Sequence, residues 1–249
     1  MRTFKLVLAY DGTEFRGWQA QPGQRTVQGV LEEALGKVLS EGPVEVAGAG
    51  RTDAGTHARG QVASFRAATP LPARAVEARL ARLLPADLAV RSLADAPDDF
   101  HARRSALGRR YAYRLTRGTD PLVERFAWRA RREVLPEALD RATRALEGEH
   151  DCSSFRAAGS SAVNPICRIE RARWRPWEWG LALEMVADHF LYHMVRIVVG
   201  TALAAAREPD PAAVMGAILA ARDRRRAGVT APARGLCLEE VFYSPGGAP

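Results

Sequence analysis

The sequence predicts an α+β protein made of two related subdomains, each built on an antiparallel sheet. Short segments of alternating hydrophobicity indicate strands, and segments with helical spacing of apolar residues lie among them. These segments follow the order β-α-β-β-α-β over the first hundred residues, and a looser version of that order follows. Neighbouring strands in both halves are hairpin-like, which favours antiparallel pairing.

The first half begins with a strand at 3–10 that ends in the turn pair Asp11-Gly12. Thr26 is a suitable N-terminal cap for a helix that ends near Gly42-Pro43. The segments that complete this half are strands at 44–49 and 60–66, a helix from Leu71 to Leu84, and a strand at 88–94.

The second half begins with an alternating strand at 109–117, and Pro136 opens a helix that ends at 147. The later segments are strands at 166–174 and 180–187, helices at 189–206 and 211–221, and a last strand near 237–243. We place the joint near 100–108, and so expect an N-terminal subdomain at 1–104 and a C-terminal subdomain at 105–249.

The composition indicates a folded protein outside the membrane. The chain has 249 residues, of which 47% are hydrophobic, enough for a substantial core. Its apolar runs are shorter than the roughly 20 residues that a membrane span needs. The N-terminal apolar stretch is too short for a signal peptide and continues into a predicted strand. We therefore expect a cytoplasmic protein.

The charge balance suggests a nucleic-acid partner. The net charge is +7, and only Lys5 and Lys37 among the 36 basic residues are lysines. Arginine binds phosphate in a fork and stacks on bases, so this pattern is typical of RNA or DNA binders. An arginine-rich chain can equally reflect genomic base composition or adaptation to heat, and charge alone leaves both explanations open.

Metal and redox signals are weak. The cysteines lie far apart and match neither a metal spacing nor a disulfide framework. They are Cys152, Cys167 and Cys237. His189 and His193 form an i,i+4 pair, but Phe190 stands where a zinc protease would carry glutamate. Packing, or contact with a polar ligand, explains the pair better than a metal does.

Residues 47–65, AGAGRTDAGTHARGQVASF, surround one acidic side chain, Asp53, with small residues. Glycine-rich backbone lets a large ligand approach closely. Arg51 favours the ionised form of a nearby carboxylate, so Asp53 is a candidate nucleophile or base. A turn or helix-cap aspartate is the plain alternative. The glycines fit neither a dinucleotide fingerprint, which would require glycine at position 53, nor a P-loop.

Residues 100–114, FHARRSALGRRYAYR, interleave arginines with aromatic residues. Strand alternation places Tyr111 and Tyr113 on one face and Arg110 and Arg114 on the other. A tyrosine beside arginines can stack on a base while the arginines hold phosphate. A core tyrosine opposite solvated arginines fits the same pattern.

Arg196 falls within the otherwise apolar run HFLYHMVRIVVG at 189–200. A buried guanidinium needs an anionic partner, because its desolvation is otherwise costly. Asp53 is one candidate partner, and a surface carboxylate is the other.

Taken together, these segments resemble the TruA family of tRNA pseudouridine synthases. The matching motifs span nearly the whole chain in order: YDGTEFRGWQ at 10–19, GRTDAGTHARGQV at 50–62, DDFHARRSA at 98–106, RRYAYR at 109–114, SSFRA at 153–157, HFLYHMVRIVVG at 189–200 and TAPARGLCL at 230–238. Two positions depart from the pattern: Thr56 stands where valine is usual, and Cys152 where an aromatic residue is usual.

The resemblance implies a pseudouridine synthase fold, two ferredoxin-like-related subdomains around a basic cleft. It implies an isomerase that converts uridine to pseudouridine at positions 38, 39 and 40 of the tRNA anticodon stem-loop. Atoms are neither gained nor lost, so no cofactor is expected. Members of the family are homodimers, and we expect the same here.

Carried onto this chain, the resemblance assigns catalysis to Asp53, which attacks C1′ or removes a sugar proton. Tyr111 would stack on the uracil, Arg51 and Arg196 would orient Asp53 or occupy the gap left by the flipped nucleotide, and Leu236 would line the uracil pocket. The expected tRNA contacts are Phe100, His101, Ala102, Arg103, Arg104, Ser160, Ser161, Ala162, Val163 and Asn164.

Two rival functions fit parts of the pattern. A non-catalytic RNA binder would explain the charge and the aromatics, but would leave the group around Asp53 unexplained. A glycoside hydrolase or nucleosidase would also cleave a glycosidic bond, but most such enzymes use two matched carboxylates.

Overall fold

The computed structural model describes the whole chain except residues 41, 43, 131–134, 160–163 and 245–249. Its contacts divide the chain into two units. Of the described residues, unit 1 contains Met1–Leu107 and 238–244, and unit 2 contains Gly108–Cys237. The subdomain bounds expected from the sequence, 1–104 and 105–249, stay a prediction. The division by contacts assigns the last strand to unit 1 instead of to the second half.

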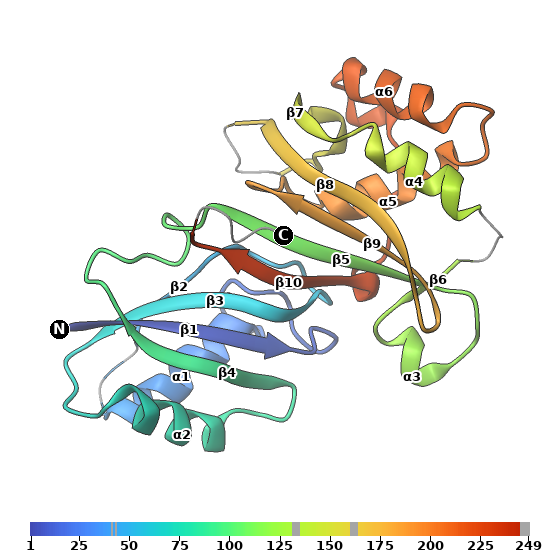
Figure 1. Ribbon diagram of the computed structural model, residues 1–249. Helices are drawn as coiled ribbons and strands as arrows, with labels where there is room; N and C mark the ends of the chain where they lie inside the picture. Colours follow the sequence, from blue (N-terminus) through green and yellow to red (C-terminus); the bar gives the residue numbers. More distant parts are fainter. Residues whose placement is uncertain (41, 43, 131–134, 160–163, 245–249) are drawn as a thin grey trace. The chain divides into compact units, whose positions relative to one another are not determined.

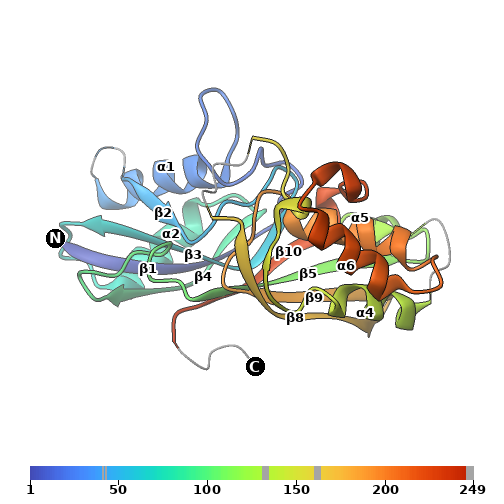
Figure 2. The same cartoon turned by 90° about the horizontal axis from the view of Figure 1, so that it is seen from above.

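Unit 1 has the order β-α-β-β-α-β, as predicted, followed by the returning strand. Its elements are β1 (Arg2–Tyr10), α1 (Val27–Leu39), β2 (Val46–Gly48), β3 (His57–Ala67), α2 (Ala73–Leu83), β4 (Leu88–Ala96) and β10 (Leu236–Phe242). The strand order is β4-β1-β3-β10, and β2 pairs with β3. Strand β1 is antiparallel to both β3 and β4. Helices α1 and α2 pack together over one face of this sheet (Figures 1 and 2).

The core of unit 1 follows the alternation seen in the sequence. Phe4, Leu6 and Leu8 of β1 are fully buried, whereas the residues between them are half-buried. Phe4 lies opposite Phe65 of β3, and the two rings stack with centroids 4.9 Å apart. At the start of α1 the Thr26 side chain accepts the Gly29 N–H, which caps the helix as predicted.

The strands of unit 2 pair mostly antiparallel. Its elements are β5 (Gly108–Thr116), α3 (Pro121–Glu124), β6 (Trp128–Arg129), α4 (Pro136–Arg144), β7 (Gly148–Asp151), β8 (Ile166–Trp177), β9 (Gly180–Ala187), α5 (Met194–Ala205) and α6 (Pro211–Ala221), with 3₁₀ helices at Ser153–Phe155, Arg224–Arg226 and Ala233–Gly235. The strand order is β5-β9-β8-β7, and β6 runs parallel to β5. Helices α4, α5 and α6 pack against one another, and α4 covers β8.

The helix predicted at 189–206 begins later, at Met194. His193 adopts a left-handed conformation with φ 61°, which interrupts helical geometry on its N-terminal side. The apolar pattern before it belongs to a turn in which Leu191 is buried. The sequence prediction did not include α3, β6 or β7, which are all four residues long or shorter.

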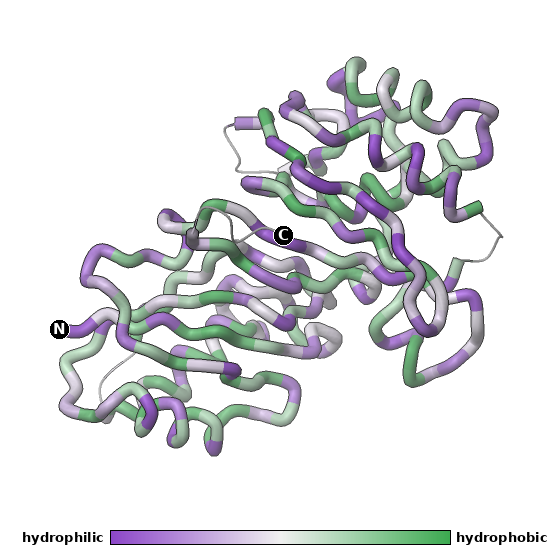
Figure 3. The backbone as a smooth tube through the Cα atoms, viewed as in Figure 1, coloured by the Kyte–Doolittle hydropathy of each residue, from purple (hydrophilic) through white to green (hydrophobic). Residues whose placement is uncertain are grey.

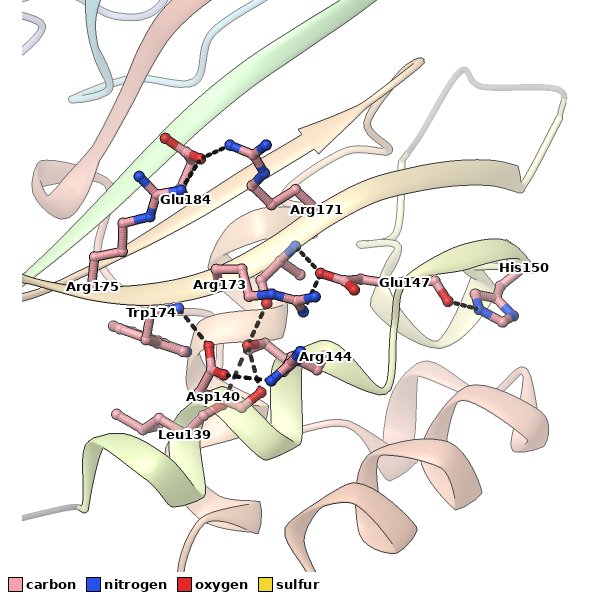
Figure 4. Close-up of polar contacts among 12 residues, drawn as sticks. Leu139, Asp140, Arg144, Glu147, His150, Arg171, Arg173, Trp174, Arg175 and Glu184 are labelled. Atoms are coloured by element: carbon pink, nitrogen blue, oxygen red, sulfur yellow. Dashed lines mark hydrogen bonds and ion pairs between the residues drawn. The ribbon is translucent and has the colours of Figure 1, made fainter. Parts of the chain in front are cut away.

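Hydrophobic and hydrophilic residues alternate along β8 (Figure 3). Beyond β7 the outer edge of this strand is covered by polar side chains of α4 and the loop after it (Figure 4). Asp140 accepts the Trp174 N–H at 3.0 Å, Glu147 accepts the Ala172 N–H at 2.9 Å, and Thr143 donates to the Ala172 carbonyl at 3.0 Å. These contacts satisfy edge groups that would otherwise be available to another strand.

Across the part of the chain that the structure describes, no helix has the length and apolar character needed to cross a membrane.

Candidate active site

Asp53 lies in the loop between β2 and β3 of unit 1. It is half-buried, its neighbour Thr52 is buried and Arg51 is exposed. The Thr56 N–H donates to the Asp53 carbonyl at 3.0 Å, and Gly55 adopts φ 77°. Asp53 therefore sits in a tight turn that leaves part of the residue accessible to a ligand.

A second segment, residues 11–18, wraps around this turn. The Trp18 N–H donates to the Thr52 carbonyl at 3.0 Å, and the Gly55 N–H donates to the Phe15 carbonyl at 3.3 Å. A Cβ atom at Gly12 would overlap the Thr56 carbonyl oxygen, so only glycine allows this close approach. The YDGTEFRGWQ motif thus forms the support of the Asp53 loop.

Directly after the loop, His57 ties the same segment to β3. Its side chain is 6% exposed, and Nδ1 accepts the Gly12 N–H at 3.1 Å and lies 3.2 Å from Asp11 Oδ1. Asp11 Oδ1 also accepts the N–H and hydroxyl of Thr13, at 3.0 and 2.6 Å. The turn after β1 is therefore held by its own side chains and by β3.

Tyr111 and Tyr113 lie in β5 of unit 2, and both are buried as their shared face predicted. The Tyr111 ring meets Phe190 edge to face, with centroids 5.1 Å apart. The Tyr113 hydroxyl donates to the Pro232 carbonyl at 2.8 Å. Burial raises the pKa of Tyr113 far above its usual value of 10.0, and Arg196 and Arg234 oppose that shift only in part. Tyr113 is therefore a neutral structural phenol.

Arg196 belongs to α5, and it is half-buried. Its Nε donates to the Ala231 carbonyl at 2.7 Å, and the Ala231 N–H donates back to the Arg196 carbonyl at 3.1 Å. This double contact holds the guanidinium stem against the segment before β10. Leu236, at the start of β10, is 6% exposed.

The segment Phe100–Arg104 forms a compact turn in unit 1. His101 Nδ1 accepts the N–H groups of Arg103 and Arg104 at 3.2 and 3.4 Å, and both arginines are exposed. Ala102 is fully buried, and its N–H donates to Ser64 Oγ at 3.0 Å. The turn therefore presents two cations from a fixed main chain.

Phe100 packs within unit 1 as well. Its ring lies 5.1 Å from that of Tyr243, whose hydroxyl donates to the Ala102 carbonyl at 2.7 Å. The Lys5 ammonium lies over both rings, at 5.6 Å from Phe100 and 4.4 Å from Tyr243. Tyr243 thus supports the segment that the sequence predicts as an RNA contact.

The other predicted tRNA-contact segment falls largely outside the described residues, which exclude Ser160, Ser161, Ala162 and Val163. Asn164 is described and exposed, and its side chain accepts the Ile166 N–H at 3.0 Å at the start of β8.

Three of the histidines and cysteines singled out in the sequence, His189, Cys167 and Cys152, lie in contact with one another. His189 Nε2 lies 3.5 Å from Cys167 Sγ, and its Nδ1 lies 3.0 Å from Asp188. The Cys167 thiol contacts Cys152 and is buried, and both effects raise its pKa. His193 instead stacks on Tyr192. Among the described residues, no group of three or more His, Cys, Asp or Glu side chains is arranged to hold a metal.

Comparison with known proteins identifies the family of the chain. A family model described as tRNA pseudouridine synthase matches residues 6–103 and 142–244. The chain belongs to the tRNA pseudouridine synthase family. It is 44% identical over 250 residues to tRNA pseudouridine synthase A of Syntrophotalea carbinolica, covering 98% of each chain. It is 42% identical to the protein of that name from Moorella thermoacetica, covering 98% of this chain and 100% of the relative, and 42% identical to the one from Myxococcus xanthus, covering 99% and 94%.

Family membership defines the reaction: the chain is an isomerase that converts uridine to pseudouridine in tRNA. The two rival functions, a non-catalytic RNA binder and a glycoside hydrolase, are thereby set aside. The first matched segment contains the Asp53 loop and the turn at Phe100–Arg103, and the second contains Arg196 and Leu236.

Sequence inspection missed several residues that support these sites. Arg234 acts electrostatically on Tyr113, and Tyr243 holds Phe100 and Ala102. Arg234 lies within the quoted TAPARGLCL motif, two residues before Leu236, so its position was a usable signal. Tyr243 lies in no motif, and its partners are more than a hundred residues away in the sequence.

Proposed function

We propose that this isomerase modifies uridines 38, 39 and 40 of the tRNA anticodon stem-loop, and that Asp53 is its catalytic residue. The observation that carries the proposal is the Asp53 loop itself. It presents a half-buried carboxylate from a turn whose main chain is hydrogen-bonded on both sides, beside an exposed arginine. Such a fixed carboxylate suits covalent or proton-transfer chemistry.

In the reaction the glycosidic bond from uracil N1 to C1′ breaks, the base turns, and C5 forms a bond to C1′. The proton on C5 leaves, and N1 gains one. Asp53 either attacks C1′ to form a covalent intermediate or removes a proton from the sugar. Both routes need one carboxylate and neither changes the atom count, so we propose that no cofactor takes part.

We propose that Tyr111 stacks on the uracil and that Leu236 lines the uracil pocket. Tyr111 is held edge to face by Phe190, which supports a fixed ring orientation. Arg51 and Arg196 would orient Asp53 or occupy the space left by the flipped nucleotide. The exposure of Arg51 suits the second role.

The target uridine lies in a stacked stem, so it must be flipped out at a cost of a few kcal/mol. We propose that the turn Phe100–Arg104 assists flipping and binds tRNA, with Ser160–Asn164 as a second contact. The exposed side chains of Arg103 and Arg104 support phosphate binding by the first of these segments.

Four further expectations complete the proposal. The enzyme acts as a homodimer in the cytoplasm, and tRNA binds in a basic cleft. Its subdomains are ferredoxin-like-related, which the β4-β1-β3 order of unit 1, with β2 beside β3, supports.

The decisive experiment measures tritium release from a tRNA transcript labelled at uridine C5. Asp53→Asn keeps the shape of the side chain but removes its charge, and we expect it to lower the rate by at least about 10³-fold, a loss in keeping with that of an essential catalytic group. Its tRNA affinity should stay within about 3-fold of wild type, because binding rests on phosphate contacts elsewhere. If Asp53→Asn released tritium at the wild-type rate, Asp53 would be excluded as the catalytic residue. Transcripts carrying a single uridine at 38, 39 or 40 test the positions.

A further inference from the structure

A buried hydrogen-bonded trio in unit 1 grips the chain immediately before Asp53. The Tyr10 hydroxyl lies 2.8 Å from Thr52 Oγ1, and Gln61 Nε2 lies 3.4 Å from the same hydroxyl. Gln61 Nε2 also donates to the Gly50 carbonyl at 2.9 Å. Tyr10 ends β1 and Gln61 lies within β3, so two paired strands of the sheet fasten the loop at two points.

The trio is almost completely shielded from water. Gln61 is 0% exposed, Tyr10 5% and Thr52 6%. The Val62 N–H donates to Gln61 Oε1 at 3.2 Å, which assigns the amide so that Nε2 is the donor. Apolar residues would fill the same space without any need for hydrogen bonds. Polar groups in this position must be satisfied by partners, and here the partners are the loop and the trio itself.

We propose that Tyr10, Thr52 and Gln61 are positioning residues that set the place of the Asp53 carboxylate against the target ribose. The inference rests on the proposed catalytic role of Asp53. Thr52 precedes Asp53 by one peptide bond, and its carbonyl is already held by Trp18. Its hydroxyl holds the same residue to Tyr10 of β1 from the side chain, so its loss removes the contact that ties Thr52 to that strand and lets the loop shift. A shift of about 1 Å in a catalytic group costs about 10²-fold in rate.

The first test compares two variants of Thr52 in single-turnover tritium release with saturating enzyme. Thr52→Val keeps the shape but removes the hydroxyl, and it should slow release by about 10- to 100-fold. Thr52→Ser keeps the hydroxyl and should stay within about 3-fold of wild type. Both should bind tRNA within about 2-fold of wild type. A wild-type rate for Thr52→Val would overturn the proposal.

Thr143→Val is the matched control, because Thr143 is a fully buried threonine of α4 whose hydroxyl is hydrogen-bonded too, here as the donor to the Ala172 carbonyl. It should lower the thermal midpoint but leave the single-turnover rate at the wild-type value. If Thr52→Val likewise lowered only the midpoint, its hydroxyl would be merely structural and the proposal would fail.

A double-mutant cycle tests whether the effects of Tyr10 and Thr52 on the rate are coupled. Tyr10→Phe keeps the ring and should slow release by about 10-fold, and adding it to Thr52→Val should cause no further loss, because the same attachment is already broken. Multiplied losses would overturn the proposal. If Thr52→Val does not fold, the comparison of Tyr10→Phe with wild type tests the same positioning role.

Asp53→Asn, measured in parallel, distinguishes the positioning role of the trio from the catalytic role of Asp53. If it is inactive while Thr52→Val is fully active, the positioning role fails and the catalytic role stands. If Asp53→Asn is fully active, both fail.

Discussion

Single residues in this protein take their roles from what surrounds them, as the two tyrosines of β5 illustrate. Sequence alternation treats Tyr111 and Tyr113 alike, and both are buried. The Tyr113 hydroxyl donates a hydrogen bond to the Pro232 carbonyl, and its ring lies so close to Gly235 that a Cβ atom there would meet it at 2.6 Å. Tyr113 is therefore locked in place, which leaves Tyr111 as the candidate for contact with the base.

The raised pKa of Tyr113 predicts a specific loss of stability at alkaline pH. Below pH 10 the phenol is neutral in both the folded and unfolded states, so its contribution is fully present. Above pH 10 the unfolded state ionises while the folded state does not, and the free energy of unfolding falls by about 1.4 kcal/mol per pH unit for this one group. Urea unfolding of wild type and Tyr113→Phe at pH 9, 10 and 11 measures the difference. Equal slopes in both proteins would contradict the prediction.

At the scale of elements, the edge of β8 shows how side chains of a helix and the loop after it can accept the free main-chain N–H groups of a strand. Asp140 and Glu147 lie seven residues apart in and after α4, and each accepts a main-chain N–H from β8 while facing an arginine, Arg144 or Arg173 (Figure 4). The pair of Asp140 with the exposed Arg144 contributes little stability by itself. The hydrogen bonds to the strand matter more, because they satisfy its outer edge.

Removing the acceptor at Asp140 should therefore cost more than removing its charge. Asp140→Ala leaves the Trp174 N–H without its partner and should lower the free energy of unfolding by about 1–3 kcal/mol. Asp140→Asn keeps an acceptor oxygen and should lose less than about 1 kcal/mol. Chemical denaturation of both variants tests this. A similar loss in the two would show that the charge, not the acceptor, stabilises the edge.

At the scale of the whole molecule, the excess of arginine over lysine bears on RNA binding only where the arginines are held in a fixed place. The net charge of +7 attracts RNA without selecting a place on the protein, whereas the turn at 100–104 offers cations on a fixed main chain. Specific phosphate contacts release counterions, so they appear in the salt dependence of binding.

Arg104→Ala should weaken tRNA binding and reduce the slope of log affinity against log salt by about 0.7–0.9, the value for one phosphate contact. Arg79→Ala removes an equal charge from an exposed position on α2, and it should leave the slope unchanged. Affinities measured between 50 and 200 mM salt, a range suited to this effect, test both variants. An equal change in the two would attribute the effect to net charge instead of to the turn.

The sequence by itself determined the order of most strands and helices, the loop around Asp53 and the family. These features are local: alternation, helical spacing and motif residues are all visible within about ten to twenty positions. Only the tertiary structure decided that β10 returns to unit 1, that α5 begins after the left-handed His193, and that Tyr10 and Gln61 grip the Asp53 loop. The return of β10 joins segments far apart in the chain, and the buried hydrogen bonds join Tyr10 to Thr52, 42 positions apart, and Gln61 to Gly50, 11 positions apart. Their pairing is set by sheet register and burial, which leave no periodic trace in the chain.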